Sequence, residues 1–137
     1  MNNLDIYHSD ENGFLPLLIT DKWQVAQITY DESFDINNIK TIDIHFKTDE
    51  SFFLLKGKAI LITAKLKNDQ FDFTTTLMEP EKIYNVPVLT WHNIALFPET
   101  KVLIVENKNS HLEEYEIKEL SNNEIDILKE ELKKYEQ

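Results

Sequence analysis

Apolar and polar residues alternate in short stretches along most of the chain. The clearest stretch covers residues 23–30 and is rich in residue types that favour β structure. Side chains of a strand point alternately to its two faces, so this pattern predicts strands with one buried face. Further strands are predicted at residues 39–46, 52–55, 58–65, 70–77, 83–86, 89–94, 102–106 and 111–117. Short strands at intervals of about 8 to 12 residues favour an all-β sandwich or barrel over a parallel α/β sheet.

The turns between these strands contain little glycine, because the chain has only 2 glycines. Gly57 separates two apolar strands, where a hairpin turn needs a positive φ angle. Asparagine and aspartate must supply other turns, and residues 67–69 and 107–109 have suitable sequences for them.

The C-terminal residues change from a strand pattern to a helix pattern. Ser121 and Glu124 have the spacing of a capping box, in which each side chain accepts a hydrogen bond from the other residue's backbone N–H. One face of the following helix carries the apolar residues Ile125, Leu128, Leu132 and Tyr135. The pattern predicts an amphipathic helix of about three turns that covers either the barrel or a partner subunit.

The chain shows no linker, repeat or change of composition that would divide it. Its 137 residues, 42% of them hydrophobic, fit one domain with one core. We therefore expect a β-barrel over residues 1–120 and a helix over residues 121–137 that belongs to the same domain.

The charge of the chain narrows the classes of partner. Its 25 Asp and Glu residues exceed its 14 Lys and Arg residues, which gives a formal net charge of −11. Such a surface repels phosphate backbones and anionic lipids. We therefore expect neither a nucleic acid nor a membrane as partner.

The chain contains no cysteine. This excludes disulfides, thiolate metal ligands and thiol nucleophiles. The first five residues lack the basic and then apolar pattern of a signal peptide, and the apolar stretches are far shorter than a membrane span. These features predict a cytoplasmic protein.

Histidines and carboxylates are the remaining candidates for chemistry. Of the four histidines, His8 and His111 lie in polar, turn-like sequence and are expected to be exposed. His45 lies on a predicted strand and shares its face with Asp43, whereas Ile44 belongs to the opposite face. The polar face of this strand points either into a pocket or into water, and the pattern leaves both open.

Two further residues fit a site with His45. Glu50 shares its face with Phe52, which suggests a pocket position, although a turn carboxylate is the alternative. His92 lies among apolar residues, where a core histidine bonded to a backbone carbonyl is the alternative. Two imidazoles and one carboxylate suit Fe, Mn, Ni or Zn and leave coordination positions open. Glu106 ends a strand and faces either the pocket or solvent.

The order and spacing of these residues resemble the cupin superfamily. Its first motif reads Gly-x5-His-x-His-x(3,4)-Glu-x6-Gly, and His45, Glu50 and Gly57 match its second half. Its second motif reads Gly-x5-Pro-x-Gly-x2-His-x3-Asn, and Pro87 and His92 match its central part. The resemblance covers roughly residues 23–106.

The chain departs from the two motifs at several positions. Asp43 stands where cupins usually have the first histidine, and Asn37 replaces the leading glycine. In the second motif, Leu89 replaces a glycine and Leu96 replaces the asparagine. The change to Asp43 concerns metal binding directly: the residue either serves as a fourth ligand or marks a site that has lost its metal.

The resemblance implies a small single-domain, RmlC-like cupin with a jelly-roll (double-stranded β-helix) barrel and a C-terminal helix. It implies His45, Glu50 and His92 as ligands of a divalent metal, and it leaves open whether Asp43 is a further ligand. It also implies a small polar or sugar-like ligand, a homodimer, and lyase, isomerase or dioxygenase chemistry if the protein is an enzyme. The alternative is a metal-free, non-enzymatic cupin that binds a ligand or serves as a dimerisation module. The sequence assigns no catalytic residue.

Overall fold

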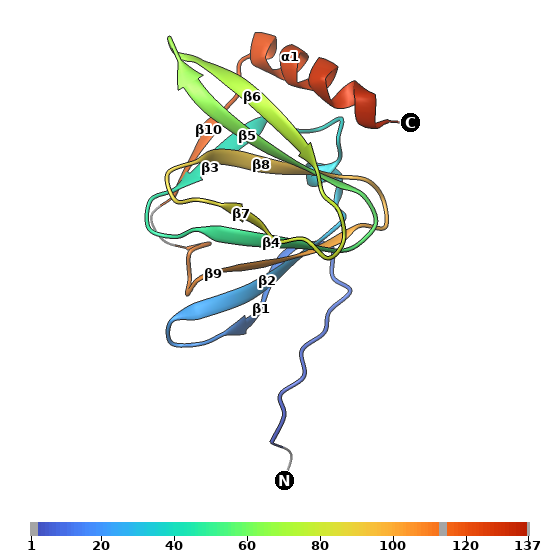
Figure 1. Ribbon diagram of the computed structural model, residues 1–137, viewed down its shortest axis with the longest axis vertical. Helices are drawn as coiled ribbons and strands as arrows, with labels where there is room; N and C mark the ends of the chain where they lie inside the picture. The colour runs from blue at the N-terminus through green and yellow to red at the C-terminus, as the bar shows by residue number, and fades with distance from the viewer. Residues whose placement is uncertain (1–2, 113–114, 137) are drawn as a thin grey trace.

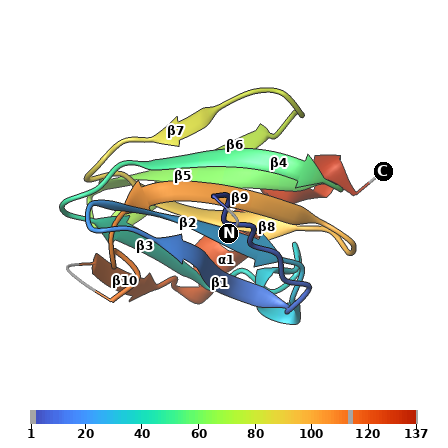
Figure 2. The same ribbon diagram turned by 90° about the horizontal axis from the view of Figure 1, so that it is seen from below.

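A computed structural model describes residues 3–112 and 115–136 of the chain. Within these residues, ten strands form two five-stranded sheets that face each other (Figures 1 and 2). The first sheet has the order β1-β2-β9-β4-β7 and the second has the order β10-β3-β8-β5-β6. Neighbouring strands of both sheets pair antiparallel. The chain is therefore mostly β, as the alternation predicts.

The strands of the first sheet are β1 (Gly13–Ile19), β2 (Trp23–Thr29), β4 (Glu50–Lys56), β7 (Tyr84–Val86) and β9 (Lys101–Asn107). Those of the second sheet are β3 (Thr41–His45), β5 (Ala59–Lys67), β6 (Gln70–Leu77), β8 (Trp91–Leu96) and β10 (Tyr115–Glu119). The helices are η1 (Glu32–Phe34), α1 (Asn122–Leu132) and η2 (Lys133–Tyr135), of which η1 and η2 are 3-10 turns.

The sequence pattern misses β1 and displaces β10. Strand β1 contains Pro16 within a run of apolar residues, so it shows no clear alternation. It lies at the edge of its sheet, where a proline needs no ladder partner, and its register shifts between Pro16 and Leu18. The pattern predicts the last strand at residues 111–117, but β10 starts at Tyr115, and residues 113–114 lie outside the described residues.

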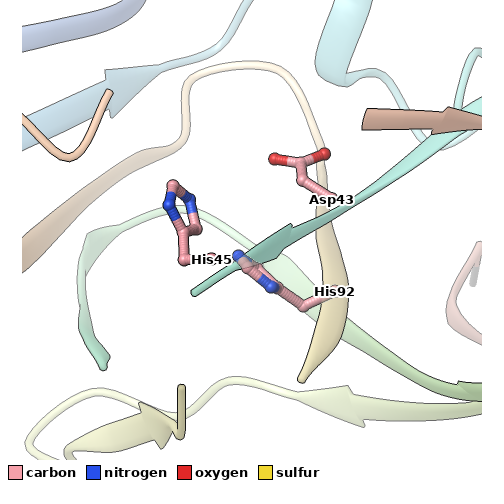
Figure 3. Close-up of side chains that lie close together, drawn as sticks. All are labelled: Asp43, His45 and His92. Carbon is pink, nitrogen blue, oxygen red and sulfur yellow. The ribbon is translucent and has the colours of Figure 1, made fainter. Parts of the chain in front are cut away.

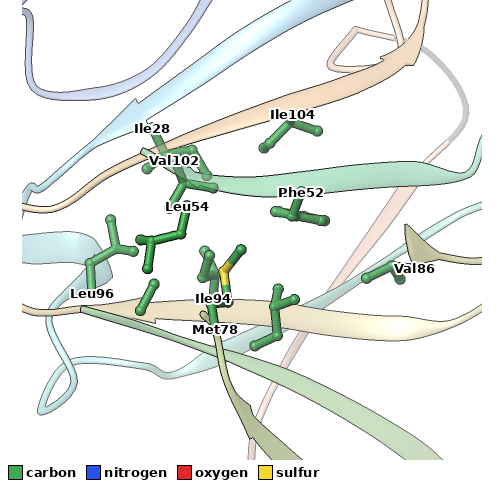
Figure 4. Packing of buried hydrophobic residues seen from close by; sticks show 11 residues of the cluster. Ile28, Phe52, Leu54, Met78, Val86, Ile94, Leu96, Val102 and Ile104 are labelled. Atoms are coloured by element: carbon green, nitrogen blue, oxygen red, sulfur yellow. The ribbon is translucent and has the colours of Figure 1, made fainter. Parts of the chain in front are cut away.

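An apolar core fills much of the space between the two sheets (Figure 4). Strand pleating places alternate residues of β2, β4 and β9 against alternate residues of β5 and β8. The buried residues of this inner cluster are Ile28, Phe52, Leu54, Ala59, Leu61, Met78, Val86, Ile94, Leu96, Val102 and Ile104. This cluster borders the candidate site described below.

A second apolar cluster lies on the other face of the second sheet, under helix α1. Ile60 and Ile62 of β5 point to this side, so β5 is buried on both faces. Leu128 and Leu132 of α1 complete the cluster. The helix therefore covers the sheet of its own chain, which is one of its two predicted roles (Figure 1).

The predicted capping box starts this helix. Ser121 Oγ accepts from Glu124 N, and Glu124 Oε1 accepts from Ser121 N. Glu124 Oε2 also accepts a 2.7 Å hydrogen bond from Phe71 N, which ties the helix to β6. Among the described residues, no helix is long and apolar enough to cross a membrane.

The predicted turns have the expected backbone. Asn68 and Asp69, between β5 and β6, both have positive φ angles, of 51° and 64°. Gly57 has a φ of 86°, and a Cβ at this position would lie 2.5 Å from Thr100 Cα. Thr100 Oγ1 accepts from Lys58 N, so the turn at Gly57 is held against Thr100.

We expect Gly57→Ala to lower the free energy of unfolding more than Gly13→Ala does. Gly13 has a similar φ of 88°, but no atom lies within 4 Å of the place that a Cβ would occupy. Gly13→Ala should therefore cost roughly 1–2 kcal/mol for the left-handed backbone alone. Gly57→Ala should cost roughly 1–3 kcal/mol more for the clash with Thr100. Urea denaturation of both variants measures the difference, and equal losses would contradict the close contact.

Candidate functional site

A pocket of about 300 Å³ opens between the two sheets. Five of its polar side chains come from four strands: Asp43 and His45 from β3, Glu50 from β4, His92 from β8 and Glu106 from β9. The remaining lining is largely apolar and aromatic, and Ile28, Phe52, Ile94 and Ile104 belong to both the pocket and the inner core cluster. The pocket thus adjoins the inner core cluster, and its polar side chains lie at the border of that cluster.

The pleat of β3 sorts its residues between pocket and core. Ile42 points away from the pocket and joins the cluster under α1, whereas Asp43 and His45 line the pocket. Asp43 is paired with His92 across the β3–β8 ladder, so the two side chains share one face. Figure 3 shows Asp43, His45 and His92 close together. Of the two possibilities for the polar face of β3, the structure shows the pocket.

Glu50 lies between the two histidines. Its Oε1 is 3.3 Å from His45 Nε2, and its Oε2 contacts His92 Nε2. Glu50 is 5% exposed, His45 is 8% and His92 is 5%. The sequence alternative for Glu50, a solvated turn carboxylate, is therefore wrong, and all four predicted site residues meet in one pocket.

The hydrogen bonds of His92 require a positive species in the pocket. His92 Nδ1 is 2.9 Å from Thr90 O, and because a carbonyl only accepts, Nδ1 must carry the proton. In the neutral ring, Nε2 then presents a lone pair to the Glu50 carboxylate. Two lone pairs in contact repel each other unless a proton or a metal cation lies between them.

In the metal-free protein, the pKa of His92 also indicates a proton between His92 Nε2 and Glu50. Burial lowers the pKa of His92, but the contact and charge of Glu50 outweigh burial and raise it to about 9. Burial raises the pKa of Glu50, but the contact with His92 reverses this, so the pKa is lowered. Burial lowers the pKa of His45, which keeps that ring neutral. The metal-free site thus pairs a protonated His92 with an ionised Glu50.

Two further carboxyls face this pair. Burial raises the pKa of Asp43 to about 6, and burial together with Glu50 raises the pKa of Glu106 to about 7. Glu106 is only 4% exposed, so of its two predicted positions the pocket is the one observed. Negative charge is therefore concentrated in a small volume. Binding of a cation or a proton there lowers the electrostatic repulsion between the carboxylates.

The sequence interpretation misses the residues that hold Glu106. Gln24, on the neighbouring strand β2, is fully buried and donates a 2.8 Å hydrogen bond from Nε2 to Glu106 Oε2. The same Nε2 lies 3.1 Å from His111 Nδ1. The prediction of His111 as an exposed loop residue is wrong, because it is partly buried and lines the pocket. The available signal is a polar residue, Gln24, at an inward position of an alternating strand.

Two overlapping groups of side chains have the geometry of a metal site. The ligand atoms of Asp43, His45 and His92 lie within 4.8 Å of one another, and so do those of His45, Glu50 and Glu106. His45 Nδ1 is buried and has no hydrogen-bond partner among the described residues. The bond from Thr90 O fixes the His92 ring, as carbonyl partners commonly do for metal-bound histidines. The donor set therefore fits a divalent transition metal.

Solved structures of low sequence identity share the fold of this chain. The chain superposes on an RmlC-like cupin from Methanocaldococcus jannaschii with a TM-score of 0.55 at 13% identity, covering 81% of this chain and 96% of that one. A cupin-2 domain protein from Shewanella frigidimarina gives 0.52 at 14% identity, covering 73% and 85%. Hydroquinone 1,2-dioxygenase from a Sphingomonas strain gives 0.52 at 10% identity, covering 72% and 68%. The chain has the cupin fold.

No protein-family model and no curated protein matches the sequence. Two residues with positive φ angles nevertheless stand where the cupin motifs have glycine. Leu89, which replaces a motif glycine, has a φ of 66°, and Glu81, which stands at the leading glycine of the second motif, has a φ of 68°. Both turns thus have the positive φ that glycine adopts most easily, although neither residue is a glycine.

We expect the metal-free protein to lose stability as the pH rises from about 7 to about 9. The raised pKa of His92, about 9 in place of its usual value of 6.5, means that the folded state binds this proton more strongly than the unfolded state. This stabilisation is complete below the unfolded pKa of His92 and is lost as the pH rises to and passes the folded one. The loss should be roughly 2 kcal/mol, or several degrees in melting temperature.

Thermal melts of chelator-treated protein measure this dependence. In a His92→Gln variant the slope between about pH 7 and pH 9 should become much flatter, because the main titrating group is absent. A wild-type melting temperature that is constant across this range would contradict the charge arrangement described above.

Proposed function

We propose that the chain binds a divalent transition metal, Fe, Mn, Ni or Zn, through His45, Glu50 and His92, with Asp43 as a fourth ligand. The observation that carries the proposal is the contact between His92 Nε2 and Glu50 Oε2 while His92 Nδ1 is bonded to Thr90 O. A metal ion between two such lone pairs binds both and removes their repulsion.

The position of Asp43 supports its role as a ligand. One of its carboxylate oxygens lies within 4.8 Å of a nitrogen of each of the same two imidazoles. Exchange of a histidine for aspartate keeps a donor atom and changes it from nitrogen to oxygen, which all four candidate metals accept. Glu106 groups with His45 and Glu50 in the same way, so a further carboxylate oxygen is within reach of the ion.

The pocket beside this site supports a ligand-binding role. Two imidazoles and two carboxylates leave coordination positions of a six-coordinate ion open to a small polar molecule. A bound ion would polarise a carbonyl or hold an oxygen of that molecule as a Lewis acid. We assign no reaction, because no side chain of the pocket is placed against a defined reacting atom.

Metal analysis of protein purified without chelators tests the proposal. We expect roughly one ion per chain in the wild type and at least a tenfold lower content in His45→Ala and in His92→Ala. His8→Ala is the matched control, because the His8 side chain is 73% exposed and its ion-pair partner Asp10 is exposed as well. Its metal content should equal that of the wild type.

The opposite outcome defines the second candidate function. A wild type without metal, and without any gain in melting temperature on addition of Fe, Mn, Ni or Zn salts, would refute the metal site. A cupin that binds a ligand without metal would then remain. Asp43→Asn separates the two roles of Asp43: reduced metal affinity supports a ligand, whereas unchanged affinity excludes one.

Self-association stays a prediction from the family resemblance. Helix α1 buries Leu128 and Leu132 against its own sheet, so removal of the helix would expose the core instead of reporting on a dimer contact. Sedimentation velocity of the full chain at several concentrations measures the oligomeric state directly. We expect the mass of two chains.

A further inference from the structure

The pocket has one charged wall and otherwise apolar walls. Asp43, Glu50 and Glu106 form the charged wall. Phe34, Phe52 and Ile94 belong to the apolar lining. We propose that the pocket accepts a small molecule with an apolar body of about one ring and a neutral or cationic polar end, and that it rejects carboxylates and phosphates. This inference rests on the proposed function in that it takes this pocket as the ligand site.

The charge of the pocket carries the first part of the inference. The chain has no arginine, and no lysine side chain lines the pocket among the residues that the structure describes. Lys22, Lys47 and Lys108 line a separate cavity that borders on His45. The three pocket carboxylates carry up to three negative charges, of which the protonated His92 offsets one without metal and a divalent ion would cancel two. An anionic ligand would therefore be buried beside surplus negative charge with or without metal.

Two amide donors at the pocket are already in use. Asn93 lines the pocket, but its Nδ2 donates to Thr41 O and its Oδ1 accepts from Ile94 N. Gln24 Nε2, behind Glu106, lies between Glu106 Oε2 and His111 Nδ1. A carboxylate or phosphate that entered would therefore find neither amide free to donate to it, whereas several donors normally offset the cost of burying an anion.

The apolar lining carries the second part. A volume of about 300 Å³ is at the lower end for ligand pockets and suits a body of about one ring. Phe14 of β1, Phe34 of η1 and Phe52 of β4 supply aromatic rings from three separate segments. Aromatic faces attract cations as well as apolar groups, so they and the carboxylates favour the same ligand charge.

Three probes of nearly equal shape test the inference: benzyl alcohol, benzylamine and benzoate. Calorimetric titration measures the affinity of the first two, and competition against benzyl alcohol measures whether benzoate enters the pocket. Competition ignores benzoate that binds in the lysine-lined cavity. We expect both benzyl alcohol and benzylamine to bind, and benzoate to compete at least about tenfold more weakly than either. The preference should hold for metal-free and for metal-loaded protein.

Glu106→Gln replaces one pocket carboxyl by a neutral amide at nearly constant shape. It should weaken benzylamine several-fold and leave benzyl alcohol unchanged, and Asp43→Asn repeats the test if Glu106→Gln does not fold. Benzoate that displaces benzyl alcohol as strongly as benzylamine does would overturn the inference, as would the absence of binding by all three probes. Because metal-free protein is titrated too, failure of the metal site and failure of this charge preference are separate results.

Discussion

The carboxylate of Glu50 lies between the imidazoles of His45 and His92, and this contact joins the two sheets. Glu50 belongs to β4 of the first sheet, whereas His45 and His92 belong to β3 and β8 of the second. Elsewhere the sheets meet through apolar side chains such as Phe52, Leu54 and Leu96. The charged contact therefore depends on both sheets keeping their separation and register, and the apolar cluster beside it provides that constraint.

The second sheet can present polar groups on its inner face because its outer face is independently stabilised. Ile42, Ile60 and Ile62 pack under helix α1, which the capping box starts at Ser121. Burial of this outer cluster fixes β3, β5 and β8 without any contribution from the pocket side. The pocket side chains of β3 and β8 are thus held on rigid strands, and small changes of ligand or protonation need not change the backbone that positions them.

The sequence allowed much of this arrangement to be predicted, for reasons that are local. Strand parity separates Ile42 and Ile44 from Asp43 and His45, so one polar face could be identified before its direction was known. The contacts that the sequence did not predict depend on pairing between strands that are far apart in the chain. Gln24 meets Glu106 only because β2 pairs with β9, and the two residues are 82 positions apart in the chain. Strand β1 escaped detection because a proline and a continuous apolar run hide its period.

Asp43, which stands at the position of a cupin motif histidine, bears on the proposed cation site. When such a site loses its metal, no cation offsets the charge of the pocket carboxylates. Substitution of a carboxylate by a neutral side chain then stabilises the metal-free protein. Asp43 is a change in the opposite direction, because it adds a third carboxyl to Glu50 and Glu106. Without metal, burial raises the pKa of Asp43 to about 6 and that of Glu106 to about 7, so both carboxyls bind protons more strongly than exposed carboxyls do. A pocket with two imidazoles and three carboxyls offers donor types that a divalent cation accepts, which supports the proposed metal site.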